Sequence, residues 1–488
     1  MNIQLNKNNP IKTESDLLVF SLLEDDVLSP DLKKIDKLLK GSIRKTLKEN
    51  SFKGQHGSIN RFNTYGLIAA NSVLILGLGS KKNLTPGNCY RAFAKAGKEI
   101  GKNINEVGLV FELNGSNLLS NSIEGLQQGC YKFTKYKTDE KSNNDFDLTI
   151  FSKTISDRTF SRESKKAINI TKAVTLARDI VNEPPVYLTP AKLAEISEEV
   201  AAEGNLEIKI LGRDEIKKAG MDGLYSVAKG SIQPPRFIHF TYTPKEKSKK
   251  TVAIVGKGVT FDSGGLCLKP AGSMLTMKMD MAGSAAVVGA MKAIAQLKPK
   301  HTIHGIIPAT ENMTGGDAYK PDDVYNALNG KSVEVINTDA EGRIALSDAL
   351  SYAVNLGVDE IIDLATLTGA CIVGLGSYTA GVMGNNKKLV NSILESSENV
   401  GEKMWQLPLD DELRKEIKSN IADIKNVGSR WGGAITAGLF LEHFVSDTPW
   451  THIDIAGPAY LESSNDVYPQ GGTGFAVRTL VNYLTDNK

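Results

Sequence analysis

Apolar and polar positions follow two different periods along the first third of the chain. Residues 73–76 and 107–113 are short apolar runs of strand length. Residues 29–48 instead repeat apolar side chains at helical spacing. The side chains that recur on one face are Leu32, Ile35, Leu39 and Ile43. The pattern therefore predicts two strands and one helix over residues 29–48, with lysines on the outer face of the helix.

A longer helical pattern covers residues 162–181. It ends at Asn182-Glu183-Pro184-Pro185, because proline disfavours helical geometry in the residue before it. We interpret this helix as the connection between two domains. The predicted division is an N-terminal domain over residues 1–160, a connecting helix over residues 161–185 and a larger C-terminal domain over residues 186–488.

The rest of the chain alternates strand and helix more regularly. Predicted strands cover residues 251–255, 333–336 and 361–365, and predicted helices cover residues 284–296 and 344–354. This alternation is typical of an α/β sheet with helices on its faces. In such sheets functional residues collect in loops at the carboxyl ends of strands.

Composition narrows the class of protein without changing this architecture. The chain has 488 residues, which favours more than one domain, and 41% apolar and 23% charged residues, which is ordinary for a globular protein. A net charge of +2 implies no obligate polyanionic partner. The four cysteines form no C-x-x-C pair, there is no signal-peptide core, and no apolar run is long enough for a membrane span. We expect a soluble cytoplasmic protein.

Several common catalytic motifs are absent. The six histidines are scattered, without an H-E-x-x-H zinc helix, and there is no G-x-S-x-G nucleophile elbow. The glycine-rich segments at residues 77–80 and 255–258 lack the full spacing of a dinucleotide fingerprint and of a phosphate loop.

Carboxylates are concentrated instead in loops that follow predicted strands. Asp262 lies in GVTFDSGG, Asp280 in MKMDMAG, and Asp339 and Glu341 in NTDAEGR. Asp339 and Glu341 are two residues apart, so their side chains point the same way if the segment is extended. Four converging carboxylates would repel one another unless cations neutralised them, and two divalent ions would balance their charge. Oxygen ligands suit manganese, magnesium or zinc alike. The alternative is that these are separate, solvated loop acids.

The motifs NTDAEGR and VGKGVTFDSGG, with the lysine of CLKP, resemble the leucyl aminopeptidase family, also called cytosol aminopeptidases. The supporting segments are ARDIVNEPP, MKMDMAGSAAVVGAM, GIIPATENMTGGDAYKP, DLATLTGA and HIDIAGPAY. The resemblance runs from about residue 170 to the C-terminus and does not extend convincingly into the N-terminal third. It implies a smaller N-terminal α/β domain and a larger catalytic α/β domain, with a central mixed sheet flanked by helices.

The resemblance also implies a role for individual residues. Two divalent ions, manganese or zinc, would be held by Lys257, Asp262, Asp280, Asp339 and Glu341. The two catalytic residues that are not ligands would be Lys269 and Arg343, and the substrate contacts would be Met277, Asn337, Thr366, Leu367 and Gly369. An ammonium has no lone pair, so Lys257 would bind a metal as the neutral amine. The alternatives are a salt bridge from Lys257 to a carboxylate and a bridge from Arg343 to Glu341 or Asp339.

The implied reaction is release of N-terminal amino acids, preferably leucine, from peptides by water that two metals activate. Lys269 would stabilise the oxyanion, and a bicarbonate ion bound by Arg343 would act as the general base. Family members usually form hexamers, so a homohexamer is expected. Two alternatives stay open, namely a two-metal phosphatase and DNA binding through the lysine-rich face of residues 29–48, with Lys245, Lys247, Lys249 and Lys250 as further contacts.

Overall fold

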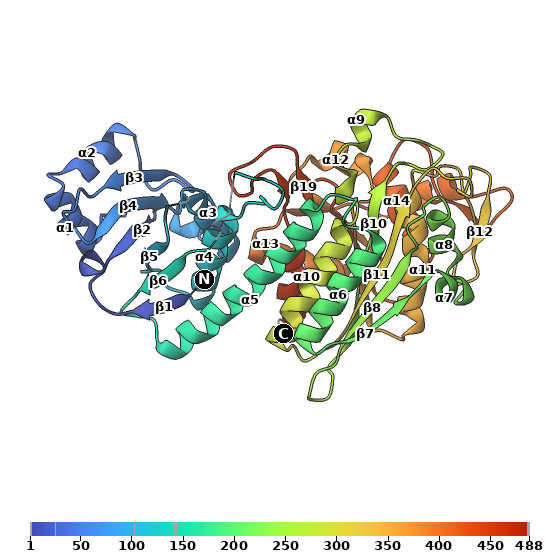
Figure 1. The fold of residues 1–488 in the computed structure, drawn as a ribbon, viewed down its shortest axis with the longest axis horizontal. Helices are drawn as coiled ribbons and strands as arrows, with labels where there is room; N and C mark the ends of the chain where they lie inside the picture. Colours follow the sequence, from blue (N-terminus) through green and yellow to red (C-terminus); the bar gives the residue numbers. More distant parts are fainter. Residues whose placement is uncertain (1, 25, 102, 140–144, 486–488) are drawn as a thin grey trace. The chain divides into compact units, whose positions relative to one another are not determined.

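The chain forms two α/β units, shown in Figure 1. The computed structural model describes residues 2–24, 26–101, 103–139 and 145–485. The first unit comprises Met1–Thr171 with two short returning segments, Asn399–Gly401 and Ser463–Pro469. The second unit contains the remaining residues. No helix within the described ranges has both the length and the apolar character that a membrane crossing requires.

The first unit is built on a six-stranded sheet with the order β1-β6-β5-β2-β4-β3. All neighbouring strands are parallel except β3 and β4. The strands are β1 (Ile3–Asn6), β2 (Ser15–Leu22), β3 (Ile59–Asn63), β4 (Ala70–Gly77), β5 (Glu106–Val110) and β6 (Asp147–Phe151). The helices are α1 (Pro30–Leu38), α2 (Ser42–Glu49), α3 (Pro86–Lys98) and α4 (Ser116–Cys130).

The side chains of β2 point alternately to the two faces of this sheet, and helices cover both faces. Leu17 and Val19 pack with residues of α3 and α4, whereas Leu18 and Phe20 pack with residues of α1 and α2. Successive strand side chains point to opposite faces, so a strand buried on both sides is apolar throughout. The strand predicted at residues 73–76 lies within β4, and the one predicted at residues 107–113 ends earlier, at Val110.

The single helix predicted over residues 29–48 is wrong, because the structure divides it into α1 and α2. Lys40 and Gly41 both adopt a positive φ, and Gly41 N donates to Asp36 O, which closes the end of α1. The buried Asp36 carboxylate then accepts from the backbone N of Arg44 at 3.1 Å and pairs with its guanidinium. Both helices keep the predicted apolar face, although the chain turns between them.

The helix predicted at residues 162–181 lies within α5 (Asp157–Asn182). Its first residues belong to the first unit and those from Lys172 onward belong to the second.

The second unit contains a nine-stranded mixed sheet with the order β16-β15-β18-β14-β9-β11-β8-β7, and β10 pairs with β11. Strands β18, β14, β9 and β11 are mutually parallel, and β10 is parallel to β11. The strands are β7 (Glu207–Leu211), β8 (Arg236–Tyr242), β9 (Thr251–Gly256), β10 (Gly258–Asp262), β11 (Thr302–Asn312), β14 (Glu360–Ala365), β15 (Ala380–Gly384), β16 (Met404–Gln406) and β18 (Trp450–Asp454).

Helices cover both faces of this sheet. Ala253 and Val255 of β9 pack with residues of α8 (Asp222–Ala228), α11 (Glu341–Asn355) and α14 (Gly433–Glu442). The alternate residues of β9 are buried on the other face, where α10 (Ala282–Leu297) contacts the strand. Figure 1 shows α6 (Pro190–Gly204) beside α10, and α15 (Val477–Thr485) also contacts α10. The predicted fold class of two α/β domains, the second with a mixed sheet flanked by helices, is confirmed.

Shorter elements complete the second unit. They are a three-stranded sheet of β12 (Val324–Asn326), β13 (Ser332–Glu334) and β17 (Ile424–Lys425), the pair β19 (Tyr460–Leu461) and β20 (Gly471–Gly472), and the helices α7 (Arg213–Lys218), α9 (Ala271–Met274), α12 (Gly369–Leu375) and α13 (Lys387–Val400). The strand predicted at residues 333–336 corresponds to β13, which ends two residues earlier.

Candidate active site

The carboxyl ends of four strands in the second unit lie at one edge of the sheet. Strands β9, β10, β14 and β18 run in the same direction, so the residues that follow them converge there. Lys257 connects β9 to β10, and Asp262 is the last residue of β10. Both residues are buried: Lys257 is 4% exposed and Asp262 is 2% exposed.

Asp280 and Glu341 reach this edge from helix starts. Asp280 ends the short 3-10 helix Met277–Met279 and lies two residues before α10, and Glu341 is the first residue of α11. A carboxylate at the N-terminus of a helix is favoured by the helix dipole. The expectation that Asp339 and Glu341 share an extended segment is wrong, because residues 338–339 form a turn and Glu341 begins the helix.

Three of the predicted ligands form a compact cluster. Asp262, Asp280 and Glu341 each offer a carboxylate oxygen within 4.8 Å of the others. Lys257 Nζ donates to Asp280 Oδ1 at 2.8 Å and lies 2.9 Å from Glu341 Oε1. It also donates to the Thr366 carbonyl oxygen at 3.0 Å. The salt-bridge alternative for Lys257 therefore describes this structure, in which the ammonium occupies a position between the carboxylates.

Asp339 joins the cluster through Lys269. Lys269 Nζ lies 2.8 Å from Asp262 Oδ2 and 2.6 Å from Asp339 Oδ1. The Lys269 side chain is 14% exposed and that of Asp339 is 33% exposed, so this pair forms the more open side of the site. All four predicted carboxylates are thus brought together, each in contact with a lysine ammonium.

Burial sets the protonation of these groups. Burial raises the pKa of both Asp280 and Glu341 above the usual value for a carboxyl group, and the charge of Asp262 adds to both increases. Burial alone would lower the pKa of Lys257, but the neighbouring carboxylates of Asp280, Glu341 and Asp262 raise it above its usual value. For Lys269, too, burial lowers the pKa, but the carboxylates of Asp262 and Asp339 outweigh this effect and raise the pKa above its usual value.

These residues fit divalent metal ions. Glu341 is 1% exposed, and its Oε2 accepts no hydrogen bond from any described residue. A buried carboxylate oxygen without a donor is costly unless a cation meets it. Four carboxylates against two lysines also leave negative charge that cations would neutralise.

Sequence reasoning missed Asn312, which holds two parts of the site together. Asn312 is fully buried at the end of β11, and its Nδ2 donates to Asp262 Oδ1 at 2.8 Å and to the Thr338 carbonyl oxygen at 2.9 Å. Tyr319 donates its hydroxyl to the same carbonyl at 2.6 Å. The available signal was a polar residue that ends a long apolar strand, within the segment ATENM.

Arg343 lies behind the cluster in α11. It is 7% exposed, and its Nη1 donates to the Asn426 carbonyl oxygen at 2.9 Å. Burial lowers the pKa of Arg343 to about 10, and the carboxylates of Glu341 and Asp454 oppose this decrease. No ion pair joins Arg343 to Glu341 or Asp339 in the part of the chain that the structure describes. The alternative of such a bridge is therefore not observed.

The predicted substrate contacts are distributed around the same edge. Thr366 Oγ1 donates to Asp280 Oδ1 at 2.8 Å, and Leu367 and Gly369 continue from it into α12. Asn337 Oδ1 accepts from Asp339 N at 2.9 Å, which fixes the turn that carries this carboxylate. Met277 begins the 3-10 helix before Asp280 and is partly exposed.

Glycine at position 342 allows Lys257 to reach the cluster. A Cβ atom on Gly342 would lie 2.4 Å from Cε and 2.7 Å from Nζ of Lys257. The lysine side chain therefore passes directly over the first turn of α11. This contact explains why the motif NTDAEGR places glycine next to Glu341.

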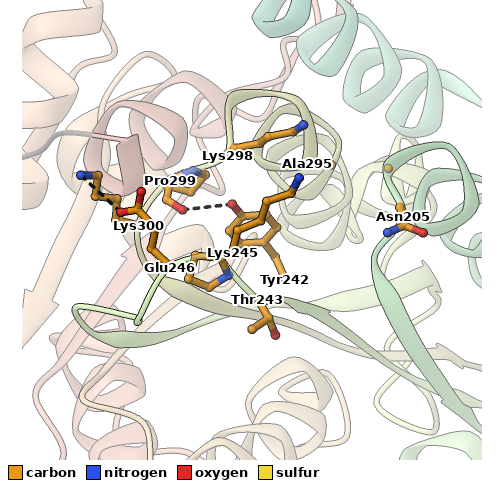
Figure 2. Close-up of a pocket in the computed structure, with 11 residues that line it drawn as sticks. Asn205, Tyr242, Thr243, Lys245, Glu246, Ala295, Lys298, Pro299 and Lys300 are labelled. Carbon is orange, nitrogen blue, oxygen red and sulfur yellow. Dashed lines mark hydrogen bonds and ion pairs between the residues drawn. The ribbon is translucent and has the colours of Figure 1, made fainter.

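A surface pocket of about 360 Å³ lies elsewhere in the second unit and contains none of these residues (Figure 2). It lies beside Tyr242 at the end of β8, and β8 runs antiparallel to β11, so it is at the opposite end of the sheet. Tyr242 donates its hydroxyl to the Pro299 carbonyl oxygen at 3.0 Å, and Lys300 lies 3.8 Å from Glu246. The chemistry of the carboxylate cluster locates the candidate active site better than this hollow does.

Comparison with known sequences covers both units. The family profile described as cytosol aminopeptidase family, catalytic domain, matches residues 175–481, and the profile of the N-terminal domain of this family matches residues 17–140. A probable cytosol aminopeptidase of Persephonella marina is 44% identical over 487 residues, which cover 97% of each chain. One from Sulfurihydrogenibium sp. is 46% identical and covers 99% of this chain and 97% of that protein.

Solved structures give the same result. A mutant of tomato leucine aminopeptidase superposes with a TM-score of 0.91 at 32% identity, covering 100% of this chain and 97% of that one. The bottromycin maturation enzyme BotP in complex with Mn superposes with a TM-score of 0.86 at 32% identity, covering 96% and 99%. The N-terminal profile match also extends the resemblance into the third of the sequence where motifs gave none. The profiles of both domains match, and relatives match over nearly their whole length, so this chain belongs to the cytosol aminopeptidase family of metal-dependent peptidases.

Proposed function

We propose that this peptidase releases amino acids one at a time from the N-termini of peptides, with a preference for leucine and other apolar residues. The observation that carries the proposal is the buried cluster of Asp262, Asp280 and Glu341 around Lys257. Family membership supports the peptidase activity, and the solved tomato relative is named a leucine aminopeptidase. General turnover of intracellular peptides is the role that fits this activity.

Two divalent ions, manganese or zinc, are proposed as cofactors. Lys257, Asp262, Asp280 and Glu341 would hold one ion, and Asp262, Asp339 and Glu341 would hold the other. When bound, such ions polarise a carbonyl group and lower the pKa of water. The manganese in the complex of BotP supports this assignment. Lys257 must give up a proton to act as a ligand, and the carboxylates that raise its pKa oppose this loss until a cation neutralises them.

Lys269 and Arg343 are the proposed catalytic residues. The charged ammonium of Lys269 lies at the more open side of the site, where it can donate hydrogen bonds to the oxyanion that forms when water adds to the scissile carbonyl. Arg343 presents a planar fork of donors that suits a bound bicarbonate, and this anion would accept the proton of the attacking water. The backbone of residues 367–369 would help to hold the anion.

The first side chain of the peptide would contact the predicted pocket residues. These are Met277, Asn337, Thr366, Leu367 and Gly369. Methionine adapts to varied apolar shapes, which supports broad tolerance with a bias toward leucine.

The remaining proposals concern location and assembly. The names of the curated relatives support a cytoplasmic protein. We propose residues 1–160 as a domain for assembly or regulation, residues 161–185 as a connecting helix, residues 186–488 as the catalytic domain, and a homohexamer as the assembly. DNA remains a weaker candidate partner than peptides.

The decisive experiment compares a free and a blocked N-terminus. The protein is stripped with a chelator and reloaded with manganese or zinc, and release of free leucine is measured from Leu-Gly and from N-acetyl-Leu-Gly. We expect metal-restored cleavage of Leu-Gly alone. Equal cleavage of both peptides, or hydrolysis of p-nitrophenyl phosphate but not of Leu-Gly, would contradict the proposal.

Two variants locate the activity. Asp339→Ala should abolish the restored cleavage, because it removes a proposed ligand. Asp317→Ala is the matched control, since Asp317 is an exposed loop acid that pairs only weakly with Lys229 at 3.8 Å. Loss of activity in both variants, or in neither, would count against the proposed site.

A further inference from the structure

A further carboxylate, which is buried, lies at the same sheet edge as the proposed active site. Asp454 is the last residue of β18 and is fully buried. In the parallel pairing of β14 and β18 it lies opposite Ala365, so it lies directly beside the segment 366–368 that leaves β14. The motif HIDIAGPAY contains it, but sequence reasoning gave it no role.

The Asp454 carboxylate holds this segment by its backbone and by a side chain. Its Oδ1 accepts from Leu367 N and from Ala456 N, both at 3.1 Å. Its Oδ2 accepts from Thr368 Oγ1 at 2.7 Å, and the same hydroxyl oxygen accepts from Cys371 N at 3.0 Å, which caps α12. Hydrogen bonds to a charged acceptor are stronger than those to a neutral one.

The other side of the segment contacts the metal-binding cluster. The Thr366 carbonyl oxygen accepts from Lys257 Nζ, and Thr366 Oγ1 donates to Asp280 Oδ1. Residues 366–368 are therefore fixed between Asp454 and two of the proposed ligands.

We propose that Asp454 is a positioning residue for the peptidase reaction, because its carboxylate fixes the segment 366–368 through the hydrogen bonds from Leu367 N and Thr368 Oγ1. This inference rests on the proposed function of that segment in holding substrate and anion. Asp454 reaches the reacting atoms only through these neighbours. Partners of this indirect kind commonly change activity by about 10–100-fold when they are removed.

Two variants separate charge from hydrogen bonding. Asp454→Asn removes the charge but keeps the contacts, since its amide can donate to Thr368 Oγ1 and its oxygen can accept from both backbone groups. Thr368→Val keeps the charge but removes the hydroxyl. Asp348→Asn is the control: Asp348 is a fully buried carboxylate that accepts from Leu224 N and Leu328 N, both at 2.9 Å, and contacts neither the segment nor Arg343.

Each variant is reloaded with manganese, checked for metal content and thermal unfolding, and assayed for kcat and KM on Leu-Gly. We expect Asp454→Asn and Thr368→Val to bind metal normally and to lose about 10–100-fold in kcat, with a smaller change in KM. We expect Asp348→Asn to lose stability and to keep its kcat. A folded, metal-loaded Asp454→Asn enzyme with unchanged kcat and KM would overturn the proposal.

Hydrogen exchange of the peptide spanning residues 366–371 gives a readout independent of activity. Faster exchange in Thr368→Val is expected, because Cys371 N loses its cap and the segment loses one contact to Asp454. Unchanged exchange would overturn the positioning role even if Asp454→Asn did not fold. A wild-type protein that fails to cleave Leu-Gly after reloading would instead contradict the proposed function.

Discussion

At the scale of single residues, Asn312 is the best-defined support of the carboxylate cluster. Its side-chain amide bridges Asp262 and the carbonyl of Thr338, next to Asp339. We predict that Asn312→Ala weakens manganese binding by about 10–100-fold, because both loops lose the group that orients them. Competition with a fluorescent chelator would measure the dissociation constant.

Asn385→Ala is the control for that change. Asn385 also bridges two backbone groups, donating to the Thr448 carbonyl oxygen at 3.0 Å and accepting from Trp450 N at 2.8 Å, and it does not contact the cluster. Its manganese affinity should equal that of the wild type. Equal weakening in the two variants would show that general destabilisation, and not orientation of Asp262, controls metal affinity.

Gly342 gives a steric prediction. In Gly342→Ala the new methyl group would overlap the buried Lys257 side chain, so that its ammonium must leave its position between Asp280 and Glu341. We expect kcat/KM to fall by about 100-fold or more, the cost of displacing a reacting group by roughly 1 Å. Gly374→Ala in α12, where a Cβ meets no atom within 4 Å, should leave peptide hydrolysis unchanged. A Gly342→Ala enzyme with normal activity would refute the contact.

At the scale of elements, neighbouring strands bring together a pair of histidines, of which His239 is buried and His304 half-buried. His239 of β8 and His304 of β11 lie with Nε2 and Nδ1 2.9 Å apart, and Tyr352 of α11 contacts His239 Nδ1 at 3.1 Å. Burial, the charge of His304 and that of Lys209 lower the pKa of His239 to about 4. Folding therefore keeps this imidazole neutral where the unfolded chain would protonate it.

The consequence is a loss of stability in acid. Between pH 6.5 and 4 the unfolded state binds a proton at His239 that the folded state does not, so the free energy of unfolding falls as the pH falls. The decrease from this residue is at most roughly 3 kcal/mol, and it is absent above pH 6.5. Urea unfolding of the wild type and of His239→Gln at pH 5 and pH 7.5 measures it. The variant should show a smaller pH dependence, and an identical dependence would contradict the assignment.

At the scale of the whole molecule, the carboxylate cluster of Asp262, Asp280 and Glu341 belongs entirely to the second unit. Ions that bind only the folded state stabilise it by mass action, by about 2.7 kcal/mol at one hundred times the dissociation constant. We therefore predict that adding manganese to the metal-free protein raises the unfolding temperature of the second unit and leaves that of the first unchanged.

The tryptophans allow this to be measured. All three, Trp405, Trp431 and Trp450, lie in the second unit. Tryptophan fluorescence therefore reports that unit alone, whereas circular dichroism reports both. The fluorescence transition should move to higher temperature with manganese. An equal shift of the whole dichroism curve would show instead that the two units unfold as one.

The sequence alone determined the features that depend on the order of residues within one helix, strand or motif. Helical spacing and apolar runs predicted the positions of α5, α10, α11, β4, β9 and β14, because these periods reflect which face of each element is buried. The motifs at the strand ends likewise identified the family, because a motif is recognised from the order of residues along the chain alone. The same motifs supplied the group of proposed ligands, Lys257, Asp262, Asp280, Asp339 and Glu341.

Only the tertiary structure decided how these groups meet. The placement of Lys257 and Lys269 between carboxylates depends on the register of strands far apart in sequence, and so do the contacts of Asn312 and Asp454. The break between α1 and α2 likewise depends on the pairing of Asp36 with Arg44, which the apolar period does not record. Periodicity reports burial along one element, whereas the convergence of polar side chains follows from how several elements pack together.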